Sequence, residues 1–119
     1  MEANMKLEEQ NSKPVTAGTA PLSSKEMEAL LLQTKAWSLG NKEIARDFRF
    51  KDFREAMQFV NDVAAIANDQ DHHPDIFISY NKVRVTLSTH KIGGLSLNDF
   101  IVAAKIDRMA DRQHNVRAA

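Results

Sequence analysis

Residues 71–99, DHHPDIFISYNKVRVTLSTHKIGGLSLND, contain three of the four histidines of the chain and its clearest strand pattern. Residues 75–80 and 83–89 predict two strands joined by a turn at Asn81 and Lys82. Apolar and polar side chains alternate along the second strand, with Val83, Val85 and Leu87 facing one way and Arg84, Thr86 and Ser88 the other. One face of this hairpin is therefore expected to be core, and the other to be solvated or functional.

Three helices are predicted around this hairpin. Ser23 and Glu26 have capping-box spacing ahead of a helix that reaches about residue 34, and Ser96 caps a helix that fades by about residue 112. Asp52 begins the middle helix, which should end near residue 68. The expected apolar stripe of the middle helix consists of Phe53, Met57, Val60, Ala64 and Ala67.

A second hairpin is predicted from residues 35–39 and 43–50, which are separated by Gly40 and Asn41. Trp37 lies in its first strand, and Arg46 is an unexplained polar side chain on the apolar side of the second. The element order is then α-β-β-α-β-β-α. Short hairpins imply antiparallel pairing, so we predict an α+β two-layer sandwich, with a four-stranded antiparallel sheet and the helices on one face.

The chain has 119 residues, which is enough for one hydrophobic core. Residues 1–22 are polar, contain two of the three prolines and show no sustained period, so they are expected to form a flexible N-terminal tail. We assign residues 23–112 to a single domain and residues 113–119 to a C-terminal tail.

The sixteen basic and sixteen acidic residues cancel, which argues against direct binding of nucleic acid. The sequence has no cysteine, no apolar run long enough to span a membrane and no secretory signal near its start. The expected location is cytoplasmic, with no membrane partner.

The histidines are the candidates for chemistry, because an unperturbed imidazole has a pKa of about 6.5 and exchanges protons near neutrality. His72 and His73 precede the predicted hairpin of residues 75–89, and His90 follows it. A hairpin returns the chain to its starting end, so the three side chains could form a cluster. An ordinary solvated loop, with Pro74 holding His73 extended, explains the pair equally well. Zinc is disfavoured because adjacent side chains on an extended chain point apart, so no metal site is predicted.

Two other residues have both a structural and a functional reading. Asp99 stands three residues after Ser96, so it could complete a capping box or orient His90. Trp37 could belong to the core or form a platform for a ligand, and the core is the commoner fate of such a residue. His114 is expected to lie on the surface.

These residues also carry a family resemblance. The segments that carry it are His72-His73-Pro74, Tyr80-Asn81-Lys82-Val83, Ser88-Thr89-His90, Gly94-Leu95-Ser96 and Asp99. At these spacings they resemble the pterin-4a-carbinolamine dehydratase family, and the similarity extends over about residues 23–110. One departure is Asn68, because the family usually has an ionisable residue four positions before the first histidine.

The resemblance implies a hydro-lyase that dehydrates 4a-hydroxytetrahydropterin to the quinonoid dihydropterin, a step of tetrahydrobiopterin recycling after an aromatic amino acid hydroxylase. It implies His72 and His90 as the proton-transfer pair, His73 as an orienting or sharing group, and Asp99 as the residue that holds His90. By the same resemblance the substrate-binding set is Asp71, His72, His73, Ser88, Thr89, His90 and Trp37. Pterin is the substrate, and no metal or organic cofactor is needed for acid-base chemistry.

The resemblance also implies a homodimer or homotetramer, and an open sheet has edges that need protection. An alternative function is a non-catalytic protein-interaction module on the same fold, a dimerisation cofactor of a helical partner. Retained histidines favour the enzyme, since binding a helix does not require them.

Overall fold

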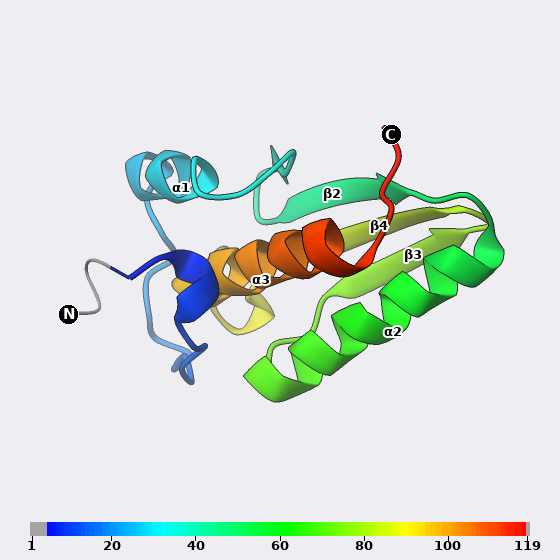
Figure 1. Ribbon diagram of the computed structural model, residues 1–119. Helices are drawn as coiled ribbons and strands as arrows, with labels where there is room; N and C mark the ends of the chain where they lie inside the picture. The colour runs from blue at the N-terminus through cyan, green and yellow to red at the C-terminus, as the bar shows by residue number, and fades with distance from the viewer. Residues whose placement is uncertain (1–4, 119) are drawn as a thin grey trace.

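The computed structural model describes residues 5–118, and it confirms the predicted order and the α+β class. The elements are η2 (Leu7–Glu9), α1 (Ser24–Leu31), β1 (Ser38–Leu39), β2 (Ile44–Arg49), α2 (Phe53–Gln70), β3 (Asp75–Ser79), β4 (Lys82–Leu87), η3 (His90–Ile92) and α3 (Leu97–Gln113). The strands form one antiparallel sheet in the order β1-β2-β4-β3. Helices α2 and α3 lie together on one face of this sheet (Figure 1).

The β3–β4 hairpin has the expected alternation, because Val83, Val85 and Leu87 are buried. Its pairing ends at Ser79 opposite Lys82, so the turn consists of Tyr80 and Asn81, one residue earlier than predicted. Tyr80 adopts the left-handed conformation, with φ of 53°. The Asn81 side chain fixes this turn by donating to the Phe50 carbonyl over 2.9 Å.

The first hairpin is shorter than predicted, since β1 contains only Ser38 and Leu39. Ala36 has φ of 58°, which interrupts an extended chain. The Lys35 N–H donates to Asp107 of α3 over 2.8 Å, where the prediction expected strand pairing. Trp37 therefore precedes the strand and does not lie in it.

Arg46, the unexplained polar residue of β2, has its partner on α3. Its guanidinium lies 2.5 Å from Asp107 and 4.3 Å from the centre of the Phe48 ring. The Trp37 indole donates to the same carboxylate over 2.8 Å. This buried cluster joins the sheet to α3, which explains how a charged side chain is tolerated on the apolar side.

The predicted apolar stripe of α2 is wrong at Phe53 and Ala64, which are exposed, whereas Ala67 is buried and Val60 packs partly buried against the core. The side chains that α2 buries are Ala56, Phe59, Val63, Ala67 and Gln70. Phe59 decides the rotation of the helix, because its ring packs 4.5 Å from that of Phe48 and 5.0 Å from that of Phe50. Phe53 is consequently 49% exposed. The helix begins at its Asp52 cap, as predicted, and ends at Asp71 in the left-handed conformation.

Helix α3 is buried over most of its circumference, well beyond the single stripe of Leu97, Phe100, Ile101 and Ala104 that its sequence period predicts. The sheet and α2 cover one side, and the N-terminal segment lies along another, with Leu7 buried in the core. Ser96 and Asp99 begin the helix as predicted, with the Ser96 N–H donating to the Asp99 carboxylate over 2.9 Å.

The segments assigned to tails contact the domain in the described residues. On the N-terminal side, Leu22 donates its N–H to the Leu95 carbonyl, and Pro21 lies so close to Gly94 that a Cβ there would come within 2.8 Å of it. On the C-terminal side, the His114 side chain is 8% exposed, packs against Phe59 and bonds to Asp62 over 2.7 Å, so it is not the surface residue that was expected.

Candidate active site

A cleft of about 410 Å³ opens where the chain enters and leaves the β3–β4 hairpin. It is lined by Ser12, Lys13, Pro14, Val15, Gln70, Asp71, His72, His73, Ser88, Thr89, His90, Lys91 and Asn98. The hairpin thus brings His72, His73 and His90 to one cavity. Its volume falls in the range of small-molecule sites.

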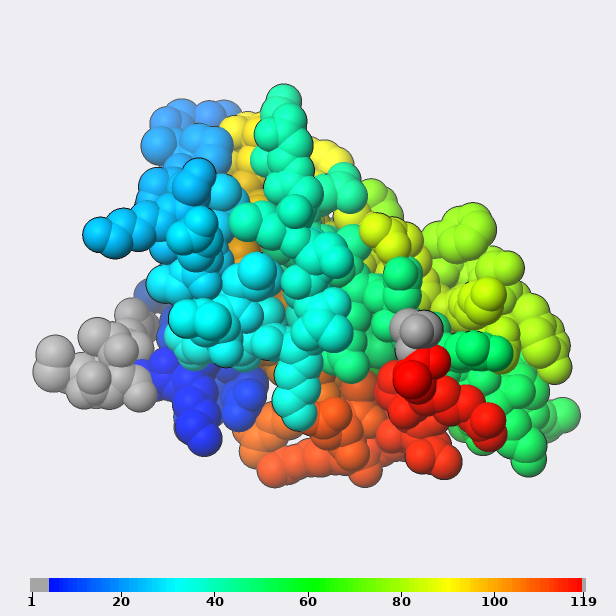
Figure 2. Space-filling model, turned by 90° about the horizontal axis from the view of Figure 1, so that it is seen from above, coloured from blue at the N-terminus to red at the C-terminus, as the bar shows by residue number. Residues whose placement is uncertain are grey.

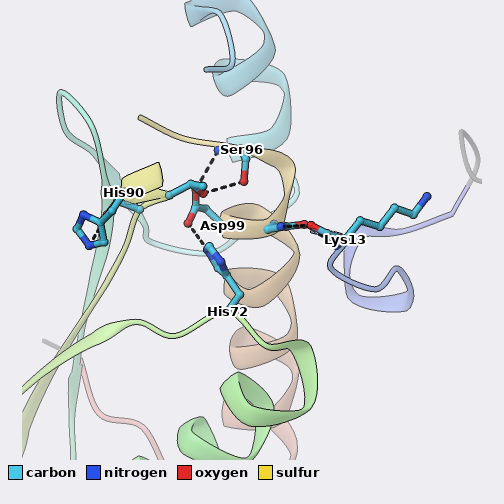
Figure 3. A network of polar contacts seen from close by, with 8 residues as sticks. Lys13, His72, His90, Ser96 and Asp99 are labelled. Atoms are coloured by element: carbon cyan, nitrogen blue, oxygen red, sulfur yellow. Dashed lines mark hydrogen bonds and ion pairs between the residues drawn. The ribbon is translucent and has the colours of Figure 1, made fainter. Parts of the chain in front are cut away.

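His72 is held by a buried carboxylate. Its Nε2 lies 2.6 Å from Asp99 Oδ1, and Asp99 has no exposed surface while the His72 side chain is 13% exposed (Figure 3). Asp99 accepts hydrogen bonds from other donors as well, so we place the shared proton on His72 Nε2. The other ring nitrogen, Nδ1, is then the one that can accept a proton.

The second oxygen of Asp99 has a structural task. Asp99 Oδ2 accepts from the Thr89 hydroxyl over 2.7 Å and from the Ser96 N–H over 2.9 Å. The Thr89 and Ser96 hydroxyls are themselves 2.8 Å apart. Among the contacts of Asp99 with described residues, none is to His90. The prediction that Asp99 holds His90 is therefore corrected, and the histidine in contact with Asp99 is His72.

The other two histidines of the cleft have neutral partners. His73 Nε2 lies 3.0 Å from Asn68 Oδ1, and His90 Nε2 lies 3.3 Å from Ser88 Oγ. Both imidazoles are exposed at the cleft. Asn68, the residue that departs from the family pattern, thus contacts His73 from the last turn of α2.

Of the other residues singled out from the sequence, Asp71, Ser88 and Thr89 also line the cleft. Trp37 does not belong to the lining and is 5% exposed in the core, where its ring meets Phe48 edge to face. The ligand-platform reading of Trp37 is corrected to the core reading. Packing under α3 accounts for its large apolar ring.

Sequence reasoning missed one wall of the cleft, which residues 12–15 form together with Gln70 and Asn98. Residues 12–15 show no helical or strand period, so no pattern placed them near the histidines. The available signal was the pair of amides, since Gln70 and Asn98 each stand next to a residue already singled out, Asp71 and Asp99.

Within residues 5–118, no group of three or more His, Cys, Asp or Glu side chains is arranged to hold a metal ion. No helix in that described range is long and apolar enough to cross a membrane.

Comparison with known proteins identifies the family. The family model of pterin 4 alpha carbinolamine dehydratase matches residues 20–109. The chain belongs to the pterin-4a-carbinolamine dehydratase family. A relative from Nitrosomonas eutropha, provisionally named as such a dehydratase, is 46% identical over 87% of this chain and 92% of its own. One from Nitrosospira multiformis with the same provisional name is 48% identical over 82% of this chain and 86% of its own.

Two solved structures support the fold of the family. The transcriptional coactivator/pterin dehydratase of Brucella melitensis has a TM-score of 0.72 and 38% identity over 76% of this chain and 98% of its own. A pterin dehydratase-like protein described as a RuBisCO assembly factor in the alpha-carboxysome has a TM-score of 0.56 and 21% identity, over 68% of this chain and 94% of its own. At that identity the second comparison shows the fold alone.

Proposed function

We propose that this protein dehydrates 4a-hydroxytetrahydropterin to the quinonoid dihydropterin and water. The observation that carries the proposal is one cleft with three histidines, of which His72 is paired to the buried Asp99. The family and the dehydratase names of its relatives support the same reaction. A pterin fits the proposal as the substrate because the cleft offers imidazoles and hydroxyls to a flat ring rich in nitrogen.

The reaction needs one acid and one base. The proton on nitrogen 5 leaves, the electron pair forms the double bond between carbon 4a and nitrogen 5, and the hydroxyl on carbon 4a departs as water after it gains a proton. His72 serves as the base, because Asp99 holds its Nε2 proton and would stabilise the imidazolium that forms. His90 supplies the proton to the leaving oxygen, and His73 orients that hydroxyl. Asp71, Ser88 and Thr89 bind the ring.

The test is stopped-flow measurement of the loss of chemically generated 4a-carbinolamine, in a buffer that is a weak general catalyst. His72→Ala and His90→Ala are each expected to lower the enzymatic rate by about 10²- to 10⁴-fold. His114→Ala is the matched control, because it removes a histidine that contacts Asp62, outside the cleft. A wild-type rate no faster than buffer would exclude the enzyme.

A second candidate function is binding of a helical protein partner, which the description of the Brucella relative as a transcriptional coactivator favours. Exposed apolar side chains lie on two elements of the fold. Phe53 on α2 and Phe77 on the edge strand β3 are 49% and 66% exposed. A stoichiometric helical partner recovered in a pull-down, together with a dead dehydratase assay, would reverse the ranking.

We also propose that the protein self-associates, as a dimer or tetramer, through these exposed apolar side chains. Strand β3 is the last strand of an open sheet and can pair with another chain. Light scattering after size exclusion tests this, and a monomer at micromolar concentration would contradict it. An aromatic amino acid hydroxylase remains the proposed source of the substrate.

A further inference from the structure

The N-terminal segment forms part of the wall of the histidine cleft. Ser12, Lys13, Pro14 and Val15 line the cavity together with His72 and His90. Figure 2 shows the blue N-terminal part of the chain packed against the yellow and orange residues that lead into α3. The region matched by the family model begins only at residue 20, so this wall lies outside what the family model describes. We call residues 12–15 the strap.

Two buried side-chain amides hold the strap by its backbone. Asn98 Oδ1 accepts from the Lys13 N–H over 3.0 Å, and Asn98 Nδ2 donates to the Lys13 carbonyl over 2.7 Å. Gln70 Oε1 accepts from the Ser12 N–H over 2.7 Å. Both amides are at least 90% buried. Backbone groups at two consecutive residues are therefore bonded to groups that belong to the rigid ends of α2 and α3.

A second anchor holds the start of the segment. Leu7 is 2% exposed in the core, and Lys105 of α3 donates to the Glu8 carbonyl over 2.9 Å. Full burial of a leucine side chain contributes about 1.5–3 kcal/mol. The strap is thus fixed through its own backbone and through the residues just before it, and a ligand that meets it does not have to order it.

The strap and His90 occupy different ends of the site. Figure 3 shows Lys13 and His90 on opposite sides of the His72–Asp99 pair, with the Lys13 side chain extending away from that pair. The wall that the strap offers to the cleft is then its backbone with Pro14 and the half-buried Val15.

We propose that the strap binds the substituent at carbon 6 of the pterin and gives the site a preference for substituted pterins. The inference rests on the proposed function. In the proposed function the histidines face the reacting centre of the ring, and Asp71, Ser88 and Thr89 bind its amide end. The strap end of the 410 Å³ cleft is then left for the substituent. Gln70 acts as a positioning residue for this wall.

The experiment compares two ligands that differ only at carbon 6. The full-length protein is titrated with 7,8-dihydrobiopterin, which carries a dihydroxypropyl group, and with 7,8-dihydropterin, which carries hydrogen, and Kd is read from fluorescence. Wild type is expected to prefer dihydrobiopterin by about fivefold or more, a difference of one to two weak interactions. Gln70→Ala removes the hydrogen bond that holds the strap at Ser12 and leaves the two Asn98 bonds at Lys13 in place, so it is expected to lower the ratio of the two constants toward one.

Two further variants keep the test decisive. Val15→Ala trims the wall without releasing it, and should lower the ratio by about twofold to threefold even if Gln70→Ala folds poorly. Gln58→Ala, the same change at an exposed position of α2, should leave the ratio unchanged. Equal affinity of wild type for both ligands, or an equal loss for both in Gln70→Ala, would overturn the strap proposal and leave the proposed function standing. Binding of neither ligand would overturn both.

Discussion

Replacing Asp99 by asparagine separates the two tasks of this carboxylate. An asparagine oxygen can still accept from the Ser96 N–H and the Thr89 hydroxyl, which lie 2.9 Å and 2.7 Å from Asp99 Oδ2. The amide nitrogen then faces His72 Nε2, where Asp99 Oδ1 now lies at 2.6 Å. Two N–H groups cannot bond to each other, so His72 must move its proton to Nδ1 or turn away. Either change removes the nitrogen that serves as the base.

The expected loss of rate is large compared with the loss of stability. A correctly oriented general base contributes about 10²- to 10⁴-fold, which is about 3–5 kcal/mol of barrier at 1.36 kcal/mol per factor of ten. The free energy of unfolding of Asp99→Asn should be about 1.5–3 kcal/mol lower than that of the wild type, which is the contribution of one hydrogen bond to a charged group. Asp99→Ala is the contrasting variant, because it removes the acceptor for Ser96 and Thr89 as well and should destabilise the fold more strongly.

The assay is stopped-flow dehydration with the single variants and with two double variants. If Asp99 acts through His72, Asp99→Asn should have almost no further effect on rate once His72→Ala is present, whereas its effect should persist in a His90→Ala background. Urea unfolding of each variant confirms that the proteins compared are folded. A full effect of Asp99→Asn in the His72→Ala background, or none in the wild type, would refute the link.

Two further predictions concern charged or ionisable positions. Asn68→Glu puts a carboxylate next to His73 Nε2, which now lies 3.0 Å from the Asn68 amide oxygen. It should change kcat/KM by less than about tenfold, because exposed ion pairs contribute only about 0.2–1 kcal/mol. A larger change would make the departure at Asn68 functionally important. Burial raises the pKa of Asp107 above 3.8, so the folded state keeps the Asp107 proton to higher pH than the unfolded chain does. The contribution of Asp107 to the free energy of unfolding should therefore fall as pH rises from about 4 through the folded pKa. Urea unfolding at a series of pH values should show the wild type losing stability relative to Asp107→Asn over that interval, and a gain would contradict it.

The sheet and the histidine cleft could be predicted because local signals agree with the tertiary structure there. The alternation of Val83, Val85 and Leu87 fixes which face of β4 is core, and a hairpin fixes that His72 and His90 return to one end. These inferences need only the period of a strand and the reach of a short turn.

The failures share a different cause, which is that packing between distant segments decided the outcome. The period of α2 allowed two stripes, and the rings of Phe48 and Phe50 selected the one that contains Phe59. Residues 35–37 have strand-forming character, yet Asp107 of α3 takes the Lys35 N–H and the Trp37 indole. The strap was missed for the same reason, because its partner amides lie far along the chain.

Asp99 shows how the two kinds of information meet in one residue. From the sequence it was a cap or a catalytic partner, and the two readings were compatible. The structure gives each oxygen its own neighbours, with Oδ2 at the start of α3 and Oδ1 on His72. The residue that begins the central helix therefore also sets the position of the proposed base. Because α3 buries more residues than the other helices, Asp99 ties His72 to the most extensively buried helix of the fold, and displacement of the helix start should reach the cleft directly.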